Sequence, residues 1–163
     1  MASITILYGS TTGATEQAAQ TLAALLEARA LPVAEATEAD FDADLLILGS
    51  STWGYGELQD DWAEAIGRLD TLDLTGRKAA VFGTGDQCGF ADTFVNAIGI
   101  LADKLTERGA TLIGQVPAAD YRHSESLAER DGRFVGLPLD DTNEPDMTPE
   151  RLSAWADLLR RSL

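Results

Sequence analysis

A short loop near the start of the chain has residue types that suit binding of a small anion. It lacks lysine and arginine and consists of Ser10, Thr11, Thr12, Gly13, Ala14 and Thr15, which we call the hydroxyl loop. Because it leads into a helical pattern, free N–H groups at a helix N-terminus would add to the hydroxyl donors, and we predict a bound phosphate. An ordinary Ser/Thr-rich helix cap is the alternative. Only three residues separate Gly9 from Gly13 and no lysine follows, which excludes a nucleotide-hydrolysing P-loop.

A second loop, residues 52–58, places large aromatic side chains among glycines and is called the tryptophan loop. Trp53 and Tyr55 follow an apolar run, with Thr52 before them and Gly54 between them. Core packing explains such aromatics at a polar loop tip poorly, so we predict that a planar ligand stacks on Trp53. A ring folded back onto the sheet edge is the alternative. The adjoining acidic residues are interpreted as a solvated helix face: Glu57, Asp60, Asp61 and Glu64.

A third loop, residues 83–94, brings more glycine and another ring and is called the glycine loop. Cys88 stands where a dinucleotide fingerprint needs its third glycine, which excludes that motif. We predict that Phe90 faces Trp53 across the ligand, the alternative being a core phenylalanine at a helix start. The polar edge of the ligand ring would meet Thr84, Gly85 and Asp86.

Other chemistry is poorly represented in the sequence. His123 is the only histidine and is interpreted as a solvated loop residue. No Ser-His-Asp arrangement or metal-ligand cluster is evident, so we expect neither a catalytic residue nor a metal site. Cys88, the only cysteine, is expected to be a buried, inert thiol, the alternative being an exposed thiol that permits disulfide-linked dimers. A single cysteine is consistent with a reducing cytoplasm.

The three loops lie between apolar segments of alternating strand-like and helical character. Strands are predicted at 3–8, 32–36, 44–49 and 77–83, a fifth begins at 111–116, and a polar excursion follows at 118–133. Helices are predicted after residue 14, over 59–69, from 94 to Gly109, and from about residue 148. This alternation predicts an α/β parallel sheet covered on both faces, with ligands beyond the C-terminal ends of its strands.

Composition limits the possible partners. The chain has 163 residues and a net charge of −15, with 27 acidic and 12 basic side chains. We therefore expect one domain spanning residues 1–163, no secretory signal, and no binding to nucleic acid or to membranes. The negative charge would serve either solubility alone or docking onto basic proteins.

Taken together, the motifs closely resemble those of the flavodoxin family in its long-chain form. The segments that carry the resemblance are Ser10–Thr15, Thr52–Trp53, Gly56–Gln59, Gly83–Gln87, and Phe134–Leu137 through Trp155. The resemblance, not the residue pattern, implies a doubly wound five-stranded sheet of order 2-1-3-4-5, whose fifth strand is interrupted by an insertion. It also implies FMN as cofactor, its phosphate on the hydroxyl loop and its ring between Trp53 and Phe90.

The resemblance implies an electron-transfer protein rather than an enzyme. It would be a low-potential one-electron carrier that shuttles between semiquinone and hydroquinone, with the semiquinone N5–H bonded to the Gly54 carbonyl. Phe90 replaces the usual tyrosine of the family and Gly54 a frequent asparagine. Implied partners are basic faces of a ferredoxin/flavodoxin-NADP reductase, a 2-oxoacid oxidoreductase or nitrogenase reductase, and we expect a monomer.

Two other functions are compatible with this fold. A small flavin-dependent quinone or NAD(P)H reductase would need a substrate pocket that the sequence does not indicate. A phospho-receiver domain would need acidic residues after the first strand and a lysine after the fifth, where Tyr8-Gly9-Ser10 and Gln115-Val116-Pro117 stand.

Overall fold

Strands and helices alternate along the computed structural model, which describes residues 2–53 and 55–163. The parallel strands run in the spatial order β2-β1-β3-β5, and both β6 and β10 pair with β5. Their bounds are β1 (Ile4–Gly9), β2 (Arg29–Pro32), β3 (Leu45–Trp53), β5 (Lys78–Thr84), β6 (Thr111–Leu112) and β10 (Leu137–Leu139). The predicted 2-1-3-4-5 order and the interrupted fifth strand are both confirmed.

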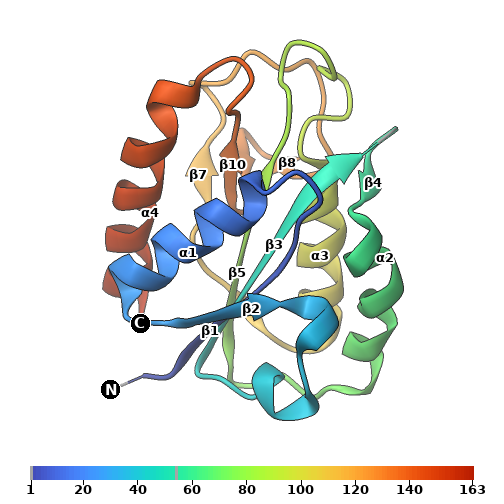
Figure 1. The fold of residues 1–163 in the computed structure, drawn as a ribbon, viewed down its shortest axis with the longest axis vertical. Helices are drawn as coiled ribbons and strands as arrows, with labels where there is room; N and C mark the ends of the chain where they lie inside the picture. The colour runs from blue at the N-terminus through green and yellow to red at the C-terminus, as the bar shows by residue number, and fades with distance from the viewer. Residues whose placement is uncertain (1, 54) are drawn as a thin grey trace.

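Helices cover both faces of this sheet (Figure 1). The helices α1 (Ala14–Leu26) and α4 (Thr148–Ser162) share one face, and α2 (Asp60–Ala65) and α3 (Asn96–Glu107) share the other. Short 3-10 turns add η1 (Val33–Glu35), η2 (Glu38–Phe41), η3 (Ile66–Thr71) and η4 (Pro145–Met147). No helix in the described part of the chain is long and apolar enough to cross a lipid bilayer.

Each face of the sheet has its own apolar core because successive side chains of a strand point to opposite sides. Ile6 of β1 packs with Leu22 of α1 and Trp155 of α4, whereas Leu7 packs on the opposite face with Trp62 and Ile98. The apolar faces of α1 and α4 therefore lie in the core.

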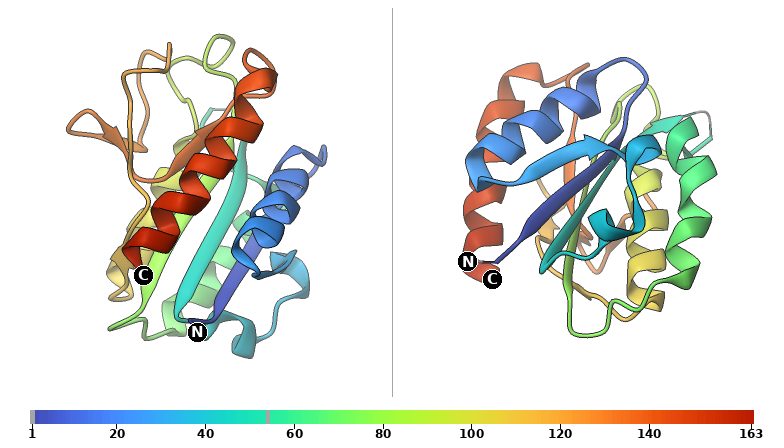
Figure 2. Two further views of the ribbon diagram at one scale, coloured as in Figure 1. Left: turned by 90° about the vertical axis from the view of Figure 1, so that its left-hand side faces the viewer. Right: turned by 60° about the horizontal axis from the view of Figure 1, so that its bottom comes forward.

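The interruption of the fifth strand forms a small structure of its own. Between β6 and β10 lie β7 (Val116–Pro117), β8 (Glu129–Arg130) and β9 (Arg133–Phe134), which form an antiparallel sheet in the order β7-β9-β8. We call residues 113–136 the insertion. Figure 2 shows it in orange, standing out beside the main sheet in the left-hand view.

Several element boundaries differ from the sequence-based expectation. The second strand was expected at 32–36 but covers Arg29–Pro32, because proline lacks an N–H for the ladder and the next residues form η1. The helix expected over 59–69 is α2 followed by the tighter η3. Phe94 is buried but precedes α3, which begins at Asn96.

Candidate functional site

The register of the sheet brings the three loops together at the carboxyl ends of its parallel strands, which we call the loop edge. Gly9 of β1 pairs with Ser50 of β3, and Ser50 in turn pairs with Gly83 of β5. All three strands are parallel, so the loops that follow them emerge side by side, in the upper half of Figure 1. β3 extends to Trp53, four residues beyond the end at Gly49 that the hydrophobic pattern indicated, and so includes the start of the tryptophan loop. Gly54, which was expected to contact the cofactor, lies outside the described residues.

The hydroxyl loop combines a helix N-terminus with hydroxyls that still have a proton to donate. Gly13 is the N-cap of α1 and has a φ of 96°, which favours glycine. The Ser10 Oγ accepts the Gly13 N–H at 3.1 Å, and the Thr11 Oγ1 accepts from the Gln59 Nε2 at 3.0 Å. A hydroxyl that accepts one bond retains its own O–H as a donor. Among the described residues, no side chain caps α1. This donor set fits a phosphate without needing a cation.

The hydroxyl loop and the glycine loop are joined by a buried pair of hydroxyls. The Oγ1 atoms of Thr15 and Thr84 lie 3.0 Å apart, and the two residues are only 1% and 8% exposed. Two of the predicted site residues, 69 positions apart in the sequence, are thus in direct contact.

Gln59 holds the hydroxyl loop against the tryptophan loop, a role that the sequence analysis missed. Its side chain donates to Thr11 and accepts the Asp61 N–H at 2.9 Å, which caps α2. A Cβ on Gly9 would lie 2.2 Å from the Gln59 Oε1, so any larger residue there would displace the Gln59 amide from these bonds. A polar residue directly before an acidic first helical turn was the available signal, and it indicated a cap rather than a contact between loops.

The predicted stacking rings are exposed rather than packed in the core. Trp53 is 40% exposed and Phe90 is 55% exposed, so the alternative of a core Phe90 is wrong. Tyr55, at 89%, is the most exposed of the three, and with Phe90 it lines a groove of about 320 Å³. Ring faces of this kind are available to a planar ligand.

Three further predicted residues also have structural partners. The Thr52 Oγ1 accepts the Ala97 N–H at 3.1 Å at the start of α3. The Gly85 N–H donates to the Leu139 carbonyl, so this group is not free to contact a ligand ring. The Asp86 carboxylate accepts the Gly89 N–H and the Asn143 amide, and these bonds hold the pKa of Asp86 below its usual range.

Two expectations about single side chains are wrong. Cys88, expected to be buried, is exposed, because its turn is closed by hydrogen bonds from the Cys88 and Gly89 N–H groups to the Asp86 carboxylate rather than by packing of the thiol. The His123 side chain, expected to be solvated, is only 5% exposed. Its ring packs against Phe94 and Phe134 and pairs with Glu129, contacts across the fold that a polar sequence neighbourhood cannot reveal.

The three loops and the sequence that flanks them contain no basic residue. Neither lysine nor arginine occurs at positions 1–28, 30–67 or 79–103, which together include all three loops. Acidic residues are frequent there, including the exposed Glu57, Asp60 and Glu64. The charged side chains of the loops themselves are therefore all acidic, while Arg122 and Arg151 join the glycine loop from outside, at Gln87 and Glu144.

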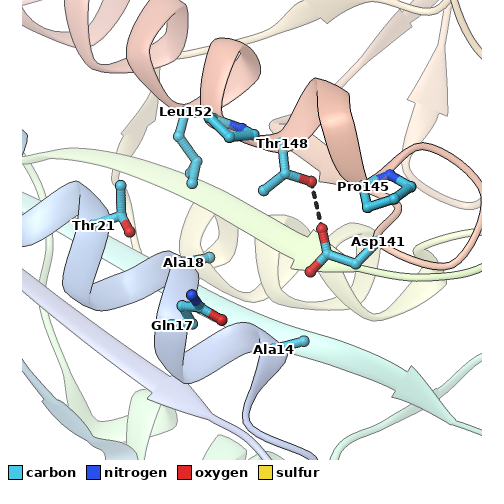
Figure 3. Close-up of a pocket in the computed structure, with 9 residues that line it drawn as sticks. Ala14, Gln17, Ala18, Thr21, Asp141, Pro145, Thr148 and Leu152 are labelled. Carbon is cyan, nitrogen blue, oxygen red and sulfur yellow. Dashed lines mark hydrogen bonds between the residues drawn. The ribbon is translucent and has the colours of Figure 1, made fainter.

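A separate groove lies between α1 and the start of α4 (Figure 3). It has a volume of about 280 Å³, and Ala14 is the one residue of the hydroxyl loop that lines it. Asp141 and Thr148 are hydrogen-bonded to each other at its rim. Neither stacking ring lines this groove, so it lies beside the anion end of the candidate site and apart from the rings.

Comparisons with known proteins agree with this geometry. The family model for flavodoxin matches residues 6–155. A flavodoxin from Picosynechococcus is 44% identical over 98% of this chain and 97% of its own length, and Flavodoxin 1 from Azotobacter vinelandii is 43% identical over the same shares. The structure of Fusobacterium nucleatum flavodoxin bound to flavin mononucleotide has a TM-score of 0.95 and 26% identity, covering 100% of this chain and 99% of that one. With this sheet order, interrupted fifth strand and near-complete coverage, the chain belongs to the flavodoxin family.

Proposed function

We propose that residues 1–163 form one FMN-binding domain that carries single electrons at low potential between other redox proteins. FMN, when bound, supplies the one-electron chemistry. The observation that carries the proposal is the convergence of an uncapped helix N-terminus, free hydroxyls and exposed rings at one edge of the sheet. The relative from Fusobacterium nucleatum, which binds flavin mononucleotide, supports it.

In this proposal, the hydroxyl loop binds the phosphate of the cofactor. Ser10, Thr11 and Thr12 donate hydroxyl protons, and the first N–H groups of α1, from Ala14 and Thr15, complete the site. Neutral donors of this kind bind a dianion through hydrogen bonds and the helix dipole alone. No lysine has to reach the site, which agrees with the basic-free sequence of all three loops.

The rings and the charges of the site would set the properties of the flavin. Trp53 and Phe90 offer ring faces for stacking, and the backbone around Thr84 and Asp86 borders the polar edge. The second electron adds negative charge to a cofactor surrounded by carboxylates and without a basic residue in the loops. Both effects disfavour this reduction, so we expect its potential to lie below that of free FMN.

The exposed aromatic tips supply a docking face for partners. Tyr55 and Phe90 are largely exposed, and Glu57 and Asp60 beside them carry negative charge. Redox proteins with basic faces would be attracted to this edge, and the partner classes implied by the family have that role. We also propose a monomer and a cytoplasmic location, the latter from the single cysteine.

A comparison of two flavins tests this proposal. The apoprotein is titrated with FMN and with riboflavin, which lacks the phosphate, and quenching of flavin fluorescence gives each Kd. We expect FMN to bind at least about a hundredfold more tightly, because several charge-assisted bonds are lost with riboflavin. Equal affinities would contradict the assignment of the hydroxyl loop.

A redox titration of the FMN-loaded protein tests whether the protein carries single electrons at low potential. We expect two resolved one-electron steps, the second well below that of free FMN. Potentials equal to those of free FMN would overturn the low-potential carrier, and NAD(P)H oxidation by the protein alone would favour the reductase alternative.

A further inference from the structure

Gln87 is a fully buried polar residue in the glycine loop that connects three segments. Its backbone N–H donates to the Asp140 Oδ2 at 3.0 Å, and its Nε2 donates to the Glu144 Oε1 at 2.6 Å. Its Oε1 accepts the N–H of Arg122 at 2.6 Å. The glycine loop, the connection from β10 to α4, and the insertion therefore meet at one side chain.

The partners determine which way the Gln87 amide is oriented. Glu144 is a carboxylate that accepts, whereas the backbone N–H of Arg122 donates. Rotating the amide by 180° would oppose like groups at both ends. Donation from Gln87, together with the Arg151 guanidinium, lowers the pKa of Glu144 below its ordinary value, which keeps this carboxylate ionised at neutral pH.

The anchored residue lies within the turn that carries Phe90. The Asp86 carbonyl accepts the Phe90 N–H at 3.0 Å, and the Asp86 carboxylate accepts the N–H groups of Cys88 and Gly89. Asn143 bonds both Asp86 and Asp140. The exposed Phe90 ring thus stands on a turn whose one fully buried residue is Gln87.

The insertion is joined to the same network by a second route. Glu144 pairs with the Arg151 Nη2 at 3.1 Å, and the Arg151 guanidinium lies over the Tyr121 ring at 4.3 Å from its centre. The Tyr121 hydroxyl donates to the Pro138 carbonyl in β10. Gln87 and Arg151 therefore contact the insertion at two adjacent residues, Arg122 and Tyr121.

We propose that Gln87 is a positioning residue that fixes the Phe90 turn against the insertion, so that FMN affinity and potential depend on where the insertion sits. This inference rests on the proposed FMN function. It assigns Gln87 an effect on the cofactor through Phe90 rather than a contact with it.

The test compares two glutamine-to-methionine variants. Gln87→Met keeps the length of the side chain but removes both amide groups. The matched control is Gln115→Met, since the Gln115 side chain makes one bond, to the Leu112 carbonyl, and Gln115 lies at the start of the insertion, away from Tyr121 and Arg122 in the sequence. We expect Gln87→Met to raise the Kd for FMN about tenfold and to change the spacing of the two one-electron potentials. Hydrogen exchange around Phe90 in the apoprotein should become faster, and Gln115→Met should change none of these.

The outcomes separate this inference from the proposed function. If the wild-type protein binds no FMN, the proposed function itself fails. If the wild-type protein binds FMN while Gln87→Met lowers only thermal stability, with Kd and potentials unchanged well below the melting temperature, Gln87 is merely structural and the inference is wrong.

A second variant covers the case in which Gln87→Met does not fold. Gln87→Glu places a carboxylate against Glu144, with Asp86 and Asp140 close by. The donors that remain are the Arg151 guanidinium and the Arg122 backbone N–H, and the Arg122 guanidinium adds positive charge beside Glu144. We expect the ratio of its Kd to that of the wild-type protein to fall toward one between pH 7.5 and pH 5, because protonation restores a donor between the two carboxyls. A ratio independent of pH would contradict the positioning role.

Discussion

At the scale of single residues, the proposed site depends on hydroxyls that can each make two hydrogen bonds, one within the protein and one to a ligand. Ser10 and Thr11 accept bonds from within the protein and retain a proton for a ligand, and Thr15 shares a bond with Thr84. An acidic protein can in this way bind an anion with neutral groups, provided that their positions are fixed in advance. Gln59 and the close approach at Gly9 supply that fixation.

Thr15→Val tests the buried hydroxyl pair. The substitution preserves shape but leaves the Thr84 hydroxyl without its partner, so we expect FMN affinity to fall by about 1–2 kcal/mol, or roughly tenfold. Thr21→Val is the matched control, because Thr21 is exposed on the same helix. Fluorescence titration with FMN measures both, and equal losses in the two variants would show that the effect is not specific to the pair.

Which residues the sequence could predict depends on what makes each one functional. The Ser10–Thr15 segment was identified as a candidate anion site because its donors are neighbours in the chain. Gln59 and Gln87 were not, since each acts by contacting a segment distant in sequence. The expectation that His123 is solvated was wrong for the same reason, because its burial comes from packing against Phe94 and Phe134.

At the scale of elements, the central strands were easier to predict than the edge. β1, β3 and β5 are flanked on both sides and read as apolar runs, and they also carry all three loops. β2 pairs with one neighbour only and is partly exposed, so its sequence signal was weak and its position was misjudged. The wrong position predicted for β2 did not affect the three loops, because they follow β1, β3 and β5.

The edge strand β2 is held by an ion pair between the exposed Arg29 and the buried Asp40, and the effect of this pair on stability should depend on pH. Arg29 of β2 pairs with Asp40 of η2, and the Thr37 N–H bonds the same carboxylate at 2.7 Å. The Thr37 N–H, with help from Arg29, lowers the pKa of Asp40 below that of an unfolded chain. The stabilisation is therefore fully present above about pH 5 and is lost as pH falls below about 4 and through the folded pKa.

Asp40→Asn measures this contribution. Urea unfolding should show a lower free energy of unfolding than in the wild-type protein at pH 7, with a difference that narrows as the pH falls below about 4. Asp42→Asn is the control, because the Asp42 side chain is 72% exposed and pairs on the surface with Arg77. A difference for Asp40→Asn that stays constant down to pH 3 would contradict the assignment.

At the scale of the whole molecule, the charge differs between the loop edge and the opposite end of the sheet, where the strands begin. The loop edge has mostly acidic side chains, with Arg122 and Arg151 near the glycine loop, whereas seven of the twelve basic side chains gather near the starts of the strands and the ends of α3 and α4. These basic residues are Arg29, Arg77, Lys78, Lys104, Arg108, Arg160 and Arg161. A net charge of −15 distributed in this way gives the molecule an orientation in the field of a basic partner.

Salt dependence of electron transfer tests whether the loop edge, and not net charge alone, guides docking. With a basic c-type cytochrome as acceptor, the bimolecular rate should fall as ionic strength rises, because the screening length is about 10 Å at 0.1 M salt. The double variant Glu57→Gln/Glu64→Gln should flatten that slope. The control Glu38→Gln/Glu107→Gln also changes the net charge from −15 to −13 but at the far edge, and it should keep most of the slope. Equal slopes in the two variants would mean that the cytochrome responds only to total charge and does not approach by the rings.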